Sequence, residues 1–86
     1  LGVDGILVLE VAPGSPAERA GLVGTRQFRD GRIAWGDIVQ AADGEQLERM
    51  DDLFRFLEER KPGDPVVLTI WRDGEQVPVE VVLAAE

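Results

Sequence analysis

The order of apolar and polar residues along the chain predicts four β-strands. Apolar, β-branched runs cover residues 5–11 and 38–42, and turn-forming glycine, proline or aspartate residues bound each run, which is typical of buried strands. Residues 66–72 form a third such run. After the two-residue turn Asp73-Gly74, apolar and polar positions alternate over residues 77–83. This alternation predicts a half-buried strand that forms a hairpin with the third run.

Two helices are predicted between these strands. Ser15 suits an N-cap, Pro16 suits the first helical position and Gly21 suits a left-handed stop, so residues 16–20 are expected to form a short helix. A longer helix is predicted over residues 50–60. Its apolar residues follow a stripe with the spacing i, i+3, i+4, i+7, which we expect to face the core: Met50, Leu53, Phe54 and Leu57.

Together these elements predict an α+β fold. With antiparallel strands and with helices closing the open ends, the expected architecture is a small half-open β-barrel capped by one short and one long helix. The chain has 86 residues, which is the size of one small domain. It contains no internal repeat and no low-complexity tract.

Composition restricts the function more than the fold. The chain has nine Lys and Arg residues against seventeen Asp and Glu residues, and the net charge of −8 argues against binding to nucleic acid or to an anionic membrane. No apolar run approaches the roughly 18 residues of a membrane span. Histidine and cysteine are absent, which excludes a Ser-His-Asp triad, a cysteine nucleophile and a zinc or haem site. We therefore expect no catalytic residue, metal or cofactor in this chain.

Three of the nine basic residues lie in one polar, glycine-punctuated segment, residues 24–32. We expect this segment to be a loop or a small hairpin that turns at Asp30-Gly31. Its exposed aromatic and basic side chains suit a contact with a protein partner, and the simpler alternative is a loop that offsets the acidic domain. The residues concerned are Arg26, Phe28, Arg29 and Arg32.

Several motifs, in the right order, resemble those of PDZ domains. Residues 11–22 are similar to the family's V-x-P-G-S-P-A-x-x-A-G-L segment, and residues 36–39 are similar to its G-D-x-I/V step. Asp43-Gly44 and the stretch from Pro62-Gly63 to Asp73-Gly74 continue the match. The resemblance covers residues 1–86 as a single PDZ domain. It is strongest to the HtrA/Deg-type serine proteases, whose cyanobacterial and chloroplast branch carries an insertion similar to residues 24–35.

The resemblance implies a binding function. A PDZ domain of this type recruits hydrophobic C-termini or unfolded protein segments by β-strand addition to a sheet edge. It also contacts its own protease domain or neighbouring subunits, and so regulates a trypsin-like protease in protein quality control. The family resemblance implies the bacterial periplasm or cell envelope as the location. The domain itself performs no chemistry.

The helix over residues 50–60 offers a second row of side chains, Asp52, Phe56 and Glu59, spaced i, i+4, i+7. We expect Phe56 to line the peptide pocket, with the two acids favouring ligands that carry basic residues. On this interpretation Phe56 contributes more to peptide affinity than to stability. The alternative is that Phe56 packs in the core.

The carboxylate-binding loop of this family lies upstream of the strand at residues 5–11, and a helix separates the two. Leu1, Gly2 and Val3 superficially resemble that loop, but only Asp4 separates them from the strand. We therefore expect a fragment that lacks the upstream carboxylate-loop strand, with Leu1-Gly2-Val3 as the second choice. Two other functions stay open: a PDZ domain of a membrane metalloprotease, a carboxyl-terminal processing protease or a secretion component, and a purely assembly-mediating domain.

Overall fold

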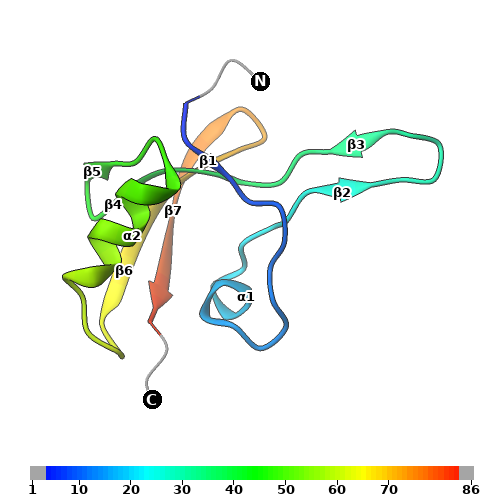
Figure 1. Cartoon of the computed structure of the whole chain (residues 1–86). Coiled ribbons are helices and arrows are strands. Elements are labelled where there is room, and N and C mark those ends of the chain that lie inside the picture. The colour runs from blue at the N-terminus through cyan, green and yellow to red at the C-terminus, as the bar shows by residue number, and fades with distance from the viewer. Residues whose placement is uncertain (1–3, 84–86) are drawn as a thin grey trace.

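A computed structural model describes residues 4–83 (Figure 1). Its sheets are antiparallel and the main sheet does not close, with the strand order β1-β4-β6-β7 and β5 also paired with β4, so the expected α+β architecture is confirmed. In the described residues, neither helix is long and apolar enough to cross a membrane. The elements are β1 Ile6–Leu7, α1 Pro16–Ala20, β2 Arg26–Gln27, β3 Ile33–Ala34, β4 Ile38–Ala42, β5 Glu45–Gln46, α2 Met50–Glu58, β6 Pro65–Arg72 and β7 Glu75–Val82.

The β6–β7 hairpin forms the longest ladder of the fold. It pairs without interruption from Pro65 opposite Val82 to Arg72 opposite Glu75. Val77, Val79 and Val81 of β7 point inward, and the positions between and after them are exposed, as the period of two predicts. The buried core spans β4, the segment after β5, α2 and this hairpin, and consists of Val39, Ala42, Leu47, Phe56, Val66, Leu68, Ile70 and Val81.

Local hydrogen bonds fix α1 as the sequence predicts. The Ser15 hydroxyl accepts a bond from the Glu18 N–H at 3.3 Å, and the Glu18 carboxylate accepts one from the Gly14 N–H at 2.9 Å. Gly21 ends the helix in the left-handed conformation, with a φ of 87°. The finished helix packs against β7 (Figure 1).

The first strand is shorter than the predicted run of residues 5–11. Only Ile6 and Leu7 pair with β4. Beyond them the Val8 N–H bonds to the Asp37 carbonyl, and the Val8 carbonyl accepts from Thr25. The chain therefore leaves the ladder where β4 begins and crosses to the loop after α1, because that loop supplies the next hydrogen-bond donors.

The face that α2 buries differs from the predicted stripe. Met50 and Phe54 are exposed, whereas Phe56 is only 4% exposed and belongs to the core together with the half-buried Leu53 and Leu57. The helix is thus rotated by about 60° relative to expectation. Two stripes with the same spacing overlap on this helix. The predicted stripe has four apolar members, Met50, Leu53, Phe54 and Leu57. The fold instead buries the stripe that contains Leu53, Phe56 and Leu57.

A charged clasp joins the start of β4 to the end of β6. Asp37 is 2% exposed, and its carboxylate accepts bonds from the Arg72 Nε at 2.8 Å and Nη2 at 2.6 Å. The same carboxylate accepts the Val23 N–H at 2.9 Å, and Arg72 also donates to the Gly21 carbonyl at 3.1 Å. This bidentate pair ties the loop after α1 to the sheet.

The β2–β3 hairpin extends away from the main sheet (Figure 1). The expected turn at Asp30-Gly31 is confirmed: Gly31 has a φ of 89°, and the Phe28 N–H donates to the Arg32 carbonyl at 2.8 Å. All residues from 26 to 35 are exposed. The structure therefore presents the basic and aromatic side chains of this segment to solvent.

Gly36 is expected not to tolerate a side chain. A Cβ at this position would lie 2.6 Å from the Val23 carbonyl oxygen and 2.7 Å from the Thr25 nitrogen, both backbone atoms that cannot rotate away. Gly36→Ala should therefore lower the free energy of unfolding by about 1–3 kcal/mol, which urea denaturation will measure. Gly31→Ala measures the other cost of replacing a glycine, because nothing lies within 4 Å of a Cβ there but the φ of 89° is unfavourable for alanine. Unchanged stability in Gly36→Ala would contradict the steric explanation.

Candidate functional site

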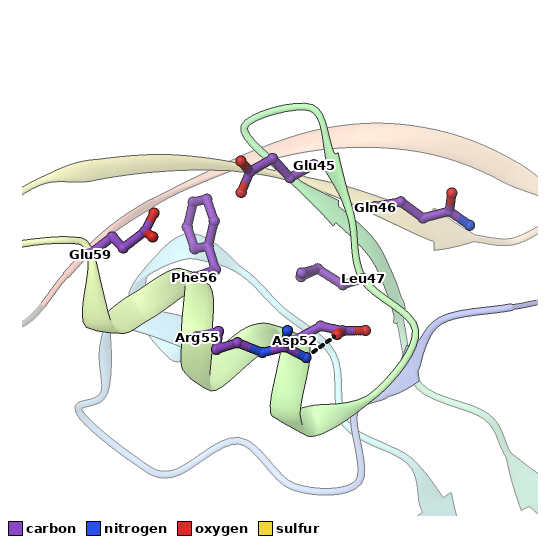
Figure 2. A pocket seen from close by; sticks show the side chains of 7 residues that line it. All are labelled: Glu45, Gln46, Leu47, Asp52, Arg55, Phe56 and Glu59. Atoms are coloured by element: carbon purple, nitrogen blue, oxygen red, sulfur yellow. Dashed lines mark hydrogen bonds and ion pairs between the residues drawn. The ribbon is translucent and has the colours of Figure 1, made fainter.

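An open groove of about 270 Å³ runs between α2 and the segment that contains β5 (Figure 2). Three of its side chains, Asp52, Phe56 and Glu59, are the row predicted from helical spacing. Since these residues share one side of α2, the helix forms one wall of the groove. The opposite wall comes from β5 and the residue after it. The complete lining is Glu45, Gln46, Leu47, Asp52, Arg55, Phe56 and Glu59.

Phe56 forms the apolar floor of this groove. Figure 2 shows its ring pointing from α2 toward the chain at Glu45 and Leu47. With 4% of its surface exposed, the residue is a core side chain whose edge reaches the groove. Phe56 thus packs in the core, as the alternative predicted, and it also lines the groove, so its removal is expected to cost stability.

The Asp52 carboxylate already has partners within the protein. It accepts the Glu48 N–H at 3.0 Å and the Arg49 N–H at 3.1 Å, and its other oxygen accepts from Arg55 at 3.0 Å. The hydrogen bonds from the backbone of Glu48 and then of Arg49 lower the pKa of Asp52, since they favour the charged form. Asp52 therefore holds the start of α2 while it lines the groove.

A guanidinium group lies against the aromatic floor. The Arg60 guanidinium lies 4.0 Å from the centroid of the Phe56 ring, and its Nη2 lies 3.7 Å from the Asp43 carboxylate. Asp43 in turn bonds to the Val67 N–H at 2.8 Å. Arg60 therefore fixes the ring from the side of the β4–β5 turn, so that the Phe56 ring is held in one orientation.

A second hollow, of about 290 Å³, lies behind the same ring. It is lined on one side by α1 and α2 and on the other by β6 and β7, and its walls expose only apolar surface. Phe56 lines both spaces and so separates the open groove from this apolar hollow. The other residues around it are Ser15, Pro16, Ala17, Leu22, Leu53, Leu57, Val66, Leu68, Val81 and Leu83.

The remaining predicted site residues are not part of this groove. Arg26, Phe28, Arg29 and Arg32 all belong to the β2–β3 hairpin, which lies far from α2 in Figure 1. Leu1-Gly2-Val3, the second choice for a carboxylate loop, lies outside the described residues. Sequence analysis missed the far wall of the groove, Glu45 to Leu47, because a two-residue strand has no detectable period.

The family follows from comparison with known proteins. The sequence model of the PDZ domain matches residues 2–83. The chain belongs to the PDZ domain family. This PDZ domain is 37% identical over 96% of its length to the chloroplastic Protease Do-like 1 of Arabidopsis thaliana, of which it covers 19%. It is also 35% identical over 91% of its length to a probable periplasmic DegP-like serine endoprotease of Rhizobium meliloti, of which it covers 13%.

The comparisons confirm the predicted relation to the Deg/HtrA serine proteases. The PDZ domain spans about a fifth or less of the length of these curated relatives. A solved structure agrees with the fold: a protein of Geobacillus thermodenitrificans superimposes with a TM-score of 0.67 at 30% identity, over 96% of this chain and 82% of that one. In these curated relatives the matching region is one part of a longer chain.

Proposed function

We propose that this PDZ domain binds extended peptides with apolar ends in the groove beside Phe56. The observation that carries the proposal is a groove with an aromatic floor along the long helix of a PDZ domain. β1 is at one end of the main sheet, so a strand supplied from upstream of Leu1 can pair with β1 and offer its own free edge to a peptide. Main-chain pairing supplies affinity, and the groove supplies a preference among side chains.

The rim of the groove favours basic ligands. Glu45 and Glu59 are exposed and line it, and neither forms an ion pair in the part of the chain that the structure describes. Asp52 and Arg55 also line the groove, but they form an ion pair and offset each other, so the negative potential comes from the two glutamates. A lysine or arginine next to the apolar end of a peptide would therefore be attracted to the rim.

Titration of labelled peptides tests the proposal. A peptide with an apolar C-terminus and a neighbouring lysine is expected to bind more tightly than its glutamate counterpart. Glu59→Lys should weaken binding of the lysine peptide by about threefold to tenfold, because an exposed charge pair contributes about 1 kcal/mol or less and its reversal adds repulsion. Glu58→Lys is the matched control, since Glu58 carries the same charge but does not line the groove. Fluorescence anisotropy measures the affinities.

Amidation of the peptide C-terminus separates two modes of binding. Loss of binding on amidation supports capture of a terminal carboxylate, and equal binding of both forms supports recognition of internal, unfolded segments. If neither peptide binds, or if Glu58→Lys weakens binding as much as Glu59→Lys, the groove is not the site. The purely assembly-mediating role would then replace the binding proposal.

We further propose that the domain serves a trypsin-like serine protease in protein quality control. In that role it recruits unfolded substrates and regulates the enzyme through contacts with its protease domain or with neighbouring subunits, while the domain itself performs no chemistry. The relatives named as DegP-like periplasmic endoproteases support this role and a periplasmic or cell-envelope location. Other relatives are named as chloroplastic, and they support the chloroplast as the alternative location.

The apolar hollow behind Phe56 suits an additional segment of the parent protein. We propose that residues upstream of Leu1 supply the carboxylate loop and a strand beside β1, and that their apolar side chains fill the hollow. Supporting this, the hollow is lined by apolar surface alone. The solved Geobacillus chain is longer than this one, because the match covers 96% of this chain but only 82% of the Geobacillus chain.

A further inference from the structure

We propose that the β2–β3 hairpin of one copy docks onto the outer face of α2 of a second copy. The outer face of α2 is defined here as Met50, Asp51, Phe54 and Glu58, which are all exposed. The contact joins a basic, aromatic surface to an acidic, apolar one. It does not depend on peptide binding, because the groove is formed by other residues of α2.

The hairpin combines exposed apolar and basic side chains. Phe28, Ile33 and Trp35 are 45%, 45% and 53% exposed, which is unusual for large apolar residues so close together. Residues 26–35 carry three arginines and one aspartate, a net charge of +2, and since the whole chain carries −8, the rest of the chain carries −10. The hairpin is therefore a positive projection on an acidic domain.

Part of the hairpin is already ordered for a contact. The Arg32 Nε lies 2.6 Å from the Asp30 carboxylate, and its guanidinium lies 5.3 Å from the centroid of the Phe28 ring. These contacts hold an aromatic ring and a cation together, so less side-chain freedom is lost on binding. Arg26 and Arg29, in contrast, form no ion pair among residues 4–83.

The outer face of α2 is complementary to this surface. Met50 and Phe54 are 46% and 54% exposed and stand one helical turn apart. Asp51 and Glu58 lie on the same side of the helix, and neither forms an ion pair within the described part of the chain. Two apolar side chains flanked by two unpaired carboxylates thus match aromatic residues flanked by unpaired arginines.

The geometry requires two copies. Figure 1 shows the hairpin projecting from the molecule on the side away from α2. A hairpin therefore meets the helix of a neighbour and not its own. The contact joins two different surfaces, so each copy can offer a hairpin and accept one. The peptide groove, which uses the side of α2 that carries Phe56 and Glu59, stays open in such an assembly.

Sedimentation velocity over a series of protein concentrations tests the proposal. The wild-type chain is expected to self-associate weakly, because the surfaces are small and each copy carries −8. Moderate salt is used throughout, since it screens the repulsion between whole copies more than the close contacts. A wild-type chain that stays monomeric at every concentration would overturn the proposal.

Charge reversal on each surface gives the decisive comparison. The hairpin variant Arg26→Glu/Arg29→Glu and the helix variant Asp51→Lys/Glu58→Lys should each lose self-association. The chain that carries all four substitutions has the wild-type net charge and complementary surfaces again, so its self-association should return. Circular dichroism melts establish that each variant is folded.

A matched control separates the effect of losing the docking contact from the effect of changing the net charge. Glu75→Lys/Glu80→Lys makes the same change in charge as the helix variant, but on exposed positions of β7, so it should keep self-association. Self-association that survives in both single-surface variants, or that fails to return in a folded four-substitution variant, would overturn the proposal. Peptide affinity should stay within about twofold in the hairpin variant, which distinguishes this contact from the groove.

Discussion

Arg72→Ala is expected to lower the free energy of unfolding by about 3 kcal/mol. The substitution leaves the Asp37 carboxylate, which is 2% exposed, without its bidentate partner. A buried charge that keeps only the Val23 N–H as a partner is costly. Urea denaturation measures the change. Arg55→Ala is the matched control, because its pair with Asp52 is exposed and should contribute about 0–1 kcal/mol.

A double-mutant cycle tests whether the loss arises from the pair itself. Asp37→Asn and Arg72→Met are each expected to destabilise the domain, and the double variant should lose less than the sum of the two. A coupling energy of about 1–3 kcal/mol is expected for groups in direct contact. Additive losses would show instead that the two side chains stabilise the fold independently.

The pH dependence of stability provides a second measure of the clasp. Burial by itself would raise the pKa of Asp37, but the hydrogen bonds from Arg72 and from the Val23 N–H, with the charge of Arg72, hold it below the usual 3.8. The stabilisation that the Asp37 carboxylate contributes is therefore complete at pH values above the ordinary aspartate pKa. It is lost as the pH falls through the lowered pKa of Asp37. In Arg72→Ala the folded pKa of Asp37 rises toward or above its unfolded value, so the acid-induced loss of stability from this group should become smaller or change sign.

Phe56→Ala is expected to lower the free energy of unfolding by about 3–5 kcal/mol. The ring is 4% exposed and separates the open groove from the apolar hollow, so its removal joins the two spaces and admits water to the core. Thermal and urea denaturation measure the loss. Phe54→Ala offers a matched control on the same helix: Phe54 is 54% exposed, and its loss should stay within about 0.5 kcal/mol. The reverse ranking would show that α2 buries its other face.

Part of the site was predictable from helical spacing alone. Asp52, Phe56 and Glu59 fall on one side of any helix over these residues, and the structure places all three along one groove. Which side of the helix turns inward was not predictable, because two overlapping apolar stripes compete. The one with Phe56 is buried although its fourth member is Arg60, whose guanidinium lies over the ring and whose charge pairs with Asp43.

Long-range contacts leave no recognisable pattern in the sequence. Asp37 and Arg72 are 35 positions apart, and nothing in the spacing of either motif connects them. The far wall of the groove likewise comes from a two-residue strand that exists only because it pairs with β4. The predicted hairpin at Asp30-Gly31, in contrast, needs only a turn that its own residues favour.

The elements whose causes are local were predictable from the residues that form them. Ser15 caps α1, Asp73-Gly74 turns β6 into β7, and a period of two sets the inward face of β7, since each depends on residues close in the chain. The rotation of α2, the groove beside β5 and the clasp from Asp37 to Arg72 became apparent only in the folded domain. Each of these depends on packing and hydrogen bonding between segments that are distant in the chain. The free-energy differences between the alternative arrangements are not encoded in any local pattern.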